Sequence, residues 1–297
     1  MSAAQDDAEV WFTCANELGE GSVAHPDRNS LIWCDILQRQ LYERAFSGGE
    51  ARVHDLDAMP SATALVDARH ILLVTDVDLR LFDLETGLGR PLMPFLDDQP
   101  GLRGNDGRVH PGSGAFWFGS MGKNAETEAG AIWWFRGGEL RMLFDRITIP
   151  NAICFSSDGA CAYFSDSHKQ TVWRVEVDPA TGLPTNEPAV FCRFTRGDGA
   201  PDGAIVDADG ILWIAGWGAS ALHAWGPDGR QIQKYRLPVS QPTCPAFFGP
   251  ALNEIVVTSS FEHMSAEARA AEPFAGSVVK LRRNVRGIRE PHVKIAA

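Results

Sequence analysis

The chain has 297 residues, 44% of them apolar, and a formal net charge of −11. That length suits one large all-β domain or two smaller ones, and the apolar content supports a sizeable core. The acidic charge, without any basic run with interleaved aromatic residues, argues against nucleic acid as a partner, and no apolar stretch approaches the roughly 18 residues of a membrane span.

A unit of two short strands around a turn recurs along the chain. Its first strand is apolar and often contains Trp, Phe or Tyr, and its second strand alternates and closes on a turn signal such as DPATG or GPDGR. Six units of strands and turns, spaced by about 40 to 50 residues, predict a six-bladed β-propeller. In chain order the units begin with 30-SLIWCD, 69-RHILLV, 114-GAFWFG, 160-ACAYFS, 210-GILWIA and 253-NEIVVT.

Local patterns support this prediction. Residues 172–177 alternate as in a half-buried outer strand, whereas residues 211–215 are continuously apolar, as in a strand buried between blades. Only 262-EHMSAEARAAEP has a brief helical pattern, and we expect it to form an inserted loop. A β-sandwich or two stacked β domains are the structural alternatives. Because no linker divides the chain, we expect residues 1–297 to form a single propeller domain with a central metal site.

Four segments place a polar side chain directly ahead of an apolar strand. Because the blades of a propeller surround a central channel, we expect these side chains to meet at one mouth. Carboxylate and amide oxygens, without His or Cys, suit a hard cation such as Ca²⁺, Mg²⁺ or Mn²⁺, although each residue alone is more simply a turn or cap residue. The segments are 18-LGEGSVAHPD with Glu20, 102-LRGNDGRVHPG with Asn105 and Asp106, 147-ITIPNAICF with Asn151, and 200-APDGAIVDADG with Asp202.

These motifs resemble the gluconolactonase, senescence-marker-protein (regucalcin) and luciferin-regenerating-enzyme family. The resemblance runs from LGEGS near residue 18 to 255-IVVTSS and rests on GEG, R-x-ND-G, IPN and PDG. It implies that Glu20, Asn151 and Asp202 bind the metal, with Asn105 as a fourth, often indirect, contact. It also implies that Arg103 and Asn105 hold the substrate's oxygens and that Asp202 is the general base.

The chain departs from the family pattern at a few positions. The family usually has Pro and Trp where this chain has Ser22 and Ala24, and IPNG where Ala152 stands. In the segment 122-GKNAETE, which often helps to bind substrate, Asn124 stands where some relatives carry an acid. We therefore expect Asn124 to contact the substrate and, with Lys123, to favour a more oxidised or acidic sugar lactone.

The resemblance implies a metal-dependent hydrolase that opens an aldonic, uronic or aldaric acid lactone. The expected cofactor is one divalent cation, Ca²⁺ before Zn²⁺, Mn²⁺, Mg²⁺ or Fe²⁺, and the expected partner is a small sugar lactone. Two alternatives stay open: a non-catalytic, calcium-regulatory propeller, and a related propeller that hydrolyses aryl esters or organophosphates. We expect a monomer or a weak homo-oligomer.

The remaining signals are weaker. The N-terminal residues MSAAQDDAEVW lack the basic and apolar runs of a secretory signal, so we expect a cytoplasmic protein with reduced thiols at its six cysteines. His110 and His168 follow site segments, where either a place at the channel mouth or a solvated loop is expected. Trp217 fits the inter-blade core and the wall of a sugar site equally well. The strings 19-GEGSVA and 216-GWGASA open no helix and are not nucleotide sites.

Overall fold

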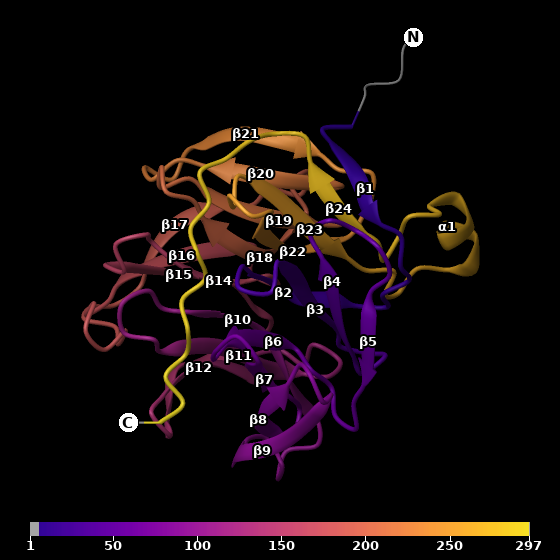
Figure 1. The fold of residues 1–297 in the computed structure, drawn as a ribbon. Coiled ribbons are helices and arrows are strands. Elements are labelled where there is room, and N and C mark those ends of the chain that lie inside the picture. The colour runs from indigo at the N-terminus through magenta and orange to yellow at the C-terminus, as the bar shows by residue number, and fades with distance from the viewer. Residues whose placement is uncertain (1–5, 297) are drawn as a thin grey trace.

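The computed structural model describes residues 6–296 and contains six four-stranded antiparallel sheets. The sheets surround a central axis, and the first strand of each sheet contacts the first strand of the next (Figure 1). This arrangement confirms the predicted six-bladed β-propeller.

The blades follow one another in chain order. Blade 1 contains β2 (Gly19–His25), β3 (Ser30–Asp35), β4 (Gln40–Ala45) and β5 (Arg52–Asp55), and blade 2 contains β6 (Ala62–Leu65), β7 (His70–Val74), β8 (Asp78–Asp83) and β9 (Leu88–Pro94). Blade 3 contains β10 (Leu102–Val109), β11 (Phe116–Gly122), β12 (Gly130–Arg136) and β13 (Glu139–Ile147), and blade 4 contains β14 (Pro150–Phe155), β15 (Cys161–Asp166), β16 (Thr171–Glu176) and β17 (Ala189–Arg193). Blade 5 contains β18 (Ala200–Val206), β19 (Leu212–Trp217), β20 (Ala221–Trp225) and β21 (Gln231–Arg236), and blade 6 contains β22 (Pro242–Phe248), β23 (Glu254–Ser259), β24 (Val278–Leu281) and β1 (Ala8–Phe12).

Blade 6 joins the two ends of the chain. Its outermost strand is the N-terminal β1, which pairs antiparallel with the C-terminal β24 (Figure 1). The sequence repeat did not reveal this closure, because β1 stands alone ahead of the first unit. The repeat also began one strand late, since each unit starts at the second strand of its blade and the innermost strand precedes it.

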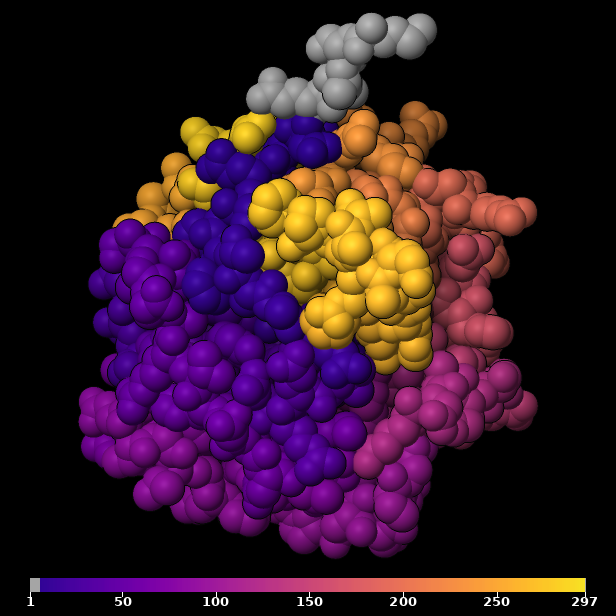
Figure 2. Space-filling model, turned by 90° about the vertical axis from the view of Figure 1, so that its right-hand side faces the viewer, coloured from indigo at the N-terminus to yellow at the C-terminus, as the bar shows by residue number. Residues whose placement is uncertain are grey.

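The insertion expected after β23 is present and contains the short helix α1 (Ala266–Ala271), capped by the side chain of Ser265. In Figure 2 this segment forms the gold surface in the middle of the view, beside the indigo N-terminal residues. Nothing helical within residues 6–296 has the length and apolar composition needed to cross a membrane.

Apolar side chains fill the spaces between adjacent blades. One cluster joins Trp213 of blade 5 to Phe247 and Ile255 of blade 6, and Trp33 and Trp117 are fully buried, as the tryptophan-rich strands predict. Burial of this kind is the main stabilising contribution to the fold. All six cysteines are free; five are buried, and burial raises the pKa of the Cys34 thiol to about 12. Such a thiol is a poor nucleophile.

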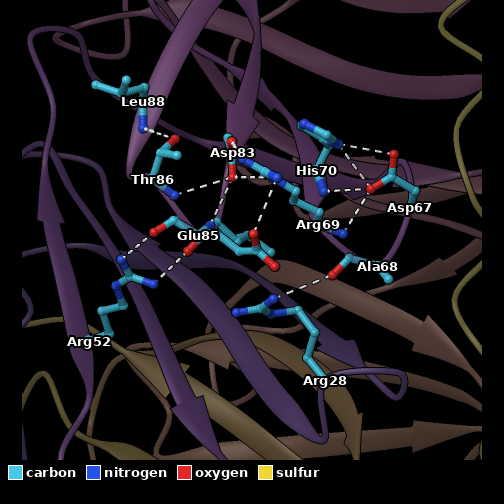
Figure 3. Close-up of polar contacts among 11 residues, drawn as sticks. Arg28, Arg52, Asp67, Ala68, Arg69, His70, Asp83, Glu85, Thr86 and Leu88 are labelled. Carbon is cyan, nitrogen blue, oxygen red and sulfur yellow. Dashed lines mark hydrogen bonds and ion pairs between the residues drawn. The ribbon is translucent and has the colours of Figure 1, made fainter.

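Polar contacts add to the contact between blades 1 and 2 (Figure 3). Arg52 donates two hydrogen bonds, at 2.7 and 2.8 Å, to the carbonyl oxygens of Leu84 and Glu85. Arg69 pairs with Asp83 and Glu85 at the surface of blade 2, where solvent screens ion pairs. The hydrogen bonds from Arg52 hold the turn that follows β8. The exposed ion pairs of Arg69 add little stability.

Residues 282–296, here called the C-terminal strap, cross one end of the channel without forming a strand of the six sheets (Figure 1). The strap carries Glu290, whose carboxylate accepts a hydrogen bond of 2.7 Å from Arg108 on β10. Backbone hydrogen bonds fasten it to four blades: Gly287 to Leu252, Ala208 to Arg286, Val293 to Leu65, and Gly137 to Lys294.

His110 neither borders the channel mouth nor lies in solvent, so both expectations for it are wrong. It is fully buried: Nδ1 contacts the Ser113 hydroxyl at 2.7 Å, and Nε2 contacts the carbonyl oxygen of Gly159 at 2.8 Å. The sequence does not reveal this burial, because the two partners of His110, Ser113 and Gly159, come from turns. His168 is exposed, as expected for a solvated loop.

Acid is expected to destabilise the protein through its buried histidines, His223 above all. Burial lowers the pKa of His223 from 6.5 to about 4, although the carbonyl of Asp198 opposes this. The unfolded chain therefore binds a proton that the native state does not, and stability is lost as pH falls from 6.5 toward 4. His223 alone should lower the free energy of unfolding by about 2 kcal/mol between pH 7 and pH 5, measured with guanidinium chloride as the difference between the wild-type protein and His223→Gln. His223→Gln should reduce this loss and His168→Gln should not; equal pH dependence in both variants would contradict the assignment.

Candidate functional site

The predicted site residues lie on the innermost strands, not ahead of them. In each of the four strands the pairing register with the next strand shifts next to the site residue, which marks a β-bulge. A bulge re-aims a side chain relative to the regular pleat. The positive φ of 59° at Gly21 and 52° at Ala152 shows the local turn that results. The shifts fall between Glu20 and Val23 on β2, Gly104 and Gly107 on β10, Asn151 and Cys154 on β14, and Pro201 and Ala204 on β18.

The bulges explain the motifs. Gly21 follows the ligand candidate Glu20, and a Cβ added there would lie 2.5 Å from the carbonyl oxygen of Ser61. In IPNA, Ala152 adopts the left-handed conformation that favours glycine, which accounts for the glycine that the family usually has there. The short strings G-E-G, N-D-G, P-N-A and P-D-G therefore encode one backbone feature that recurs in four blades.

A cavity of about 320 Å³ opens where these strands meet. Every predicted site residue borders it: Glu20, Arg103, Asn105, Asn124, Asn151 and Asp202. The two carboxylates and the Asn151 amide, which are far apart in sequence, thus share one concave site, as expected for a propeller channel. Its other lining residues include Leu18, Met121, Lys123, Ile149, Ser167, Ala200, Trp217, Glu262 and His263.

A chain of hydrogen bonds holds the polar wall of this cavity. Arg103 donates from Nη1 to Asn105 Oδ1 at 2.6 Å, and Asn105 Nδ2 donates to Asn151 Oδ1 at 2.9 Å. Asn151 Nδ2 in turn donates to the Ser167 hydroxyl, which donates to the carbonyl oxygen of Pro201. The Asn151 amide is therefore fixed between two neighbours and keeps one oxygen lone pair for a further partner.

Arg103 keeps donors for a ligand. Its recorded hydrogen bonds, to Gly104 O and Asn105 Oδ1, both use Nη1, and within residues 6–296 no protein group accepts from its other two guanidinium nitrogens. Asn105, by contrast, uses its oxygen on Arg103 and its nitrogen on Pro150 and Asn151. The Asn105 side chain is therefore suited to positioning Arg103 and Asn151.

Glu20 and Asp202 border the same cavity, where burial and neighbouring carboxylates outweigh the opposing charge of Arg103. Burial, followed by the charge of Asp106, raises the pKa of Glu20 to about 8. Burial and then the charge of Glu20 raise the pKa of Asp202 well above its ordinary range. Asp106 is itself buried; one oxygen accepts from the Ile153 N–H at 2.7 Å, and the other has no partner among residues 6–296. Buried acids of this kind need protons or a cation to be stable.

The donor set fits a hard divalent cation. Glu20 and Asp202 offer carboxylate oxygens and Asn151 offers its amide oxygen, the ligand types that Ca²⁺ and Mg²⁺ prefer. Within residues 6–296 no three His, Cys, Asp or Glu side chains are arranged to hold a metal ion. The candidate site therefore depends on the Asn151 amide as its third ligand.

Several lining residues escaped the sequence analysis. Ser167 fixes Asn151, and Glu262 and His263 come from the insertion ahead of α1, which has no recognisable motif. Trp217 borders the cavity, a position that agrees with the expected wall of a site. Asn124 lies at the exposed rim, where its side chain donates to Glu126 at 2.9 Å.

Comparison with known proteins agrees with this geometry. The model of the SMP-30/Gluconolactonase/LRE-like region matches residues 18–261. A Rhizobium meliloti (strain 1021) protein named as a proposed sugar lactone lactonase is 42% identical over 282 residues, 95% of each chain, and the L-arabinolactonase of Azospirillum brasilense is 34% identical over 89% of this chain and 87% of its own. The crystal structure of a calcium-binding protein, regucalcin, from Agrobacterium tumefaciens C58 superposes with a TM-score of 0.94 at 40% identity over 97% of both chains. Because the family model matches residues 18–261 and these two relatives are 42% and 34% identical to it, the chain belongs to the SMP-30/gluconolactonase/LRE-like family.

Proposed function

We propose that this protein is a divalent-cation-dependent hydrolase of sugar lactones and that the cavity bordered by Glu20, Asn151 and Asp202 is its active site. The observation that supports this most is the combination, in one cavity, of two buried carboxylates with raised pKa and an arginine with unused donors. A cation site alone requires the first feature and not the second. The names of two relatives, a sugar lactone lactonase and an L-arabinolactonase, agree with this activity.

The residues have distinct roles in the proposed reaction. A divalent cation held by Glu20, Asn151 and Asp202 would supply Lewis-acid polarisation of the lactone carbonyl. Asp202 accepts a proton from the attacking water and returns it to the ring oxygen as the acyl C–O bond breaks, which yields the hydroxy acid. Burial raises the pKa of Asp202 and a bound cation lowers it, so the two effects together keep this carboxylate usable as a base near neutral pH.

Arg103 and its neighbours orient the substrate. The guanidinium can make forked hydrogen bonds to substrate hydroxyl or carbonyl oxygens through the nitrogens that no protein group uses. Asn105 holds Arg103 and Asn151 in register, and Asn124 at the rim contacts the far end of the sugar. Trp217 provides an apolar surface on which a sugar ring can pack.

A non-catalytic, calcium-binding role is the second candidate, because one similar structure is named a calcium-binding regucalcin. The guanidinium nitrogens of Arg103 that no protein group uses would then have no ligand to bind. An aryl ester or organophosphate substrate is less suited to this cavity, because Arg103, Lys123 and Glu262 make its wall polar and charged. A single domain over residues 1–297, a cytoplasmic location and a monomeric or weakly associating state stay predictions.

Removal of metal ions tests the proposal. We expect the protein stripped with a chelator to lose at least about 100-fold in lactone-dependent acid release and to regain it on addition of one divalent cation. The assay follows a pH indicator across a panel of aldonolactones, and repeating the addition with Ca²⁺, Zn²⁺, Mn²⁺, Mg²⁺ and Fe²⁺ identifies the preferred ion. Cation binding by calorimetry without acid release from any lactone would instead favour the calcium-binding role.

A further inference from the structure

The cavity is bordered by side chains of both charges. Glu20 and Asp202 supply two negative charges, which one divalent cation would balance. Two cationic side chains, Arg103 and Lys123, also border the cavity, and they could attract a substrate with a carboxylate. Whether they attract such a substrate depends on which protein carboxylates already neutralise their charges.

Lys123 is committed to a partner. Its ammonium group lies 2.8 Å from Asp76 Oδ2, and the Asp76 side chain is only 11% exposed. The other oxygen of Asp76 accepts from the Met59 N–H at 2.9 Å, which fixes the carboxylate in place. Because Asp76 is held from two sides, Lys123 presents a neutralised charge to the cavity rather than a free one.

Glu262 and Arg103 border the same cavity, and no ion pair within 4.0 Å joins them in residues 6–296. Burial lowers the pKa of Arg103, and among the carboxylates that oppose this Glu262 ranks ahead of Glu20 and Asp202. The Glu262 backbone is anchored, since its N–H donates to the Ser260 hydroxyl at 2.8 Å.

We infer that Glu262 is a specificity-determining residue: with Asp76, it keeps the cationic side chains of the cavity neutralised, so that the site accepts uncharged lactones and disfavours lactones that carry a carboxylate. The inference rests on the proposed lactonase function and replaces the expectation that Lys123 and Asn124 favour an acidic lactone. A substrate carboxylate near Arg103 would meet the charge of Glu262 in a partly dry cavity, where one like charge changes binding by about tenfold or more.

A matched pair of substrates tests this inference. D-glucono-1,4-lactone ends in CH₂OH, and D-glucaro-1,4-lactone has a carboxylate in its place. For the metal-loaded wild-type protein at pH 7 we expect kcat/KM to be at least about tenfold higher for the neutral lactone. Glu262→Gln should raise the ratio of kcat/KM for the anionic lactone to kcat/KM for the neutral lactone about tenfold.

Two further variants complete the test. Asp76→Asn frees the charge of Lys123 and should also raise the rate with the anionic lactone, whereas Glu267→Gln, on the exposed helix α1, should leave both rates unchanged. Equal wild-type rates with the two lactones, or a Glu262→Gln ratio equal to that of Glu267→Gln, would overturn the inference and leave the lactonase function standing. Acid release from neither lactone would contradict the proposed function and this inference together.

Discussion

Asp202→Asn is expected to lower kcat by about 10³-fold or more while the protein still folds. The amide has the shape of the carboxylate but cannot accept the proton of the attacking water, and loss of a general base commonly reduces rates by about 10² to 10⁴. Asp202 is 6% exposed, and the charge of Glu20 is the main electrostatic contribution to its raised pKa. Removal of one of two mutually repelling carboxylates should therefore leave the free energy of unfolding of the metal-free protein unchanged or higher.

Separate measurements of metal binding and turnover distinguish the two proposed roles of Asp202. The variant should bind the activating cation more weakly, so turnover is measured at a cation concentration that calorimetry shows to be saturating. Asp209→Asn is the matched control in the same blade, because Asp209 lies on the exposed turn after β18 and pairs with Arg286 at the surface. Retention of more than about a tenth of wild-type kcat by the saturated variant would rule out Asp202 as the base.

The blade repeat was predictable because each blade repeats the same pattern of an apolar strand and a turn. The apolar second strands, such as residues 30–35, are buried on both faces, and turns with Asp-Gly pairs separate them, so their period is visible in the sequence. The inner strands were harder to recognise, because a strand such as β2 (Gly19–His25) is made of glycine, polar and small residues that resemble a loop. Its extended form depends on pairing with β3 and on contacts with neighbouring blades.

The site was predictable as a set of residues but not as a geometry. Glu20, Asn151 and Asp202 could be found because each bulge has a short, recognisable string, and a ring of blades brings them together. Glu262 could not be found, because its place at the cavity depends on the path of an insertion that follows no repeat. The engagement of Lys123 by Asp76 was likewise hidden, since it joins two blades through side chains alone.

The C-terminal strap was missed for a related reason. It lacks strand and helix patterns, and it is held by backbone hydrogen bonds, which carry no sequence signal, and by apolar side chains such as Val293 that pack into the core. Its one distinctive side chain is Glu290, which pairs with Arg108 inside the channel. Arg108 also donates to the carbonyl oxygens of Ser22, Ala204 and Pro245, at 3.2, 3.4 and 3.3 Å. One guanidinium thus joins blades 1, 3, 5 and 6 to the strap.

Arg108→Met is consequently expected to lower the free energy of unfolding by about 3 to 5 kcal/mol, because removal of one member of a buried ion pair leaves the other charge uncompensated. Glu290→Gln should be milder, since Arg108 keeps its carbonyl acceptors and the nearby charge of Asp106. The double variant should recover part of the loss, as coupled partners do. Arg289→Gln is the control, because its pair with Asp27 is exposed and contributes about 1 kcal/mol at most. Guanidinium chloride unfolding checks the series, and a loss below about 1 kcal/mol for Arg108→Met would show that the Arg108–Glu290 pair contributes little to holding the strap.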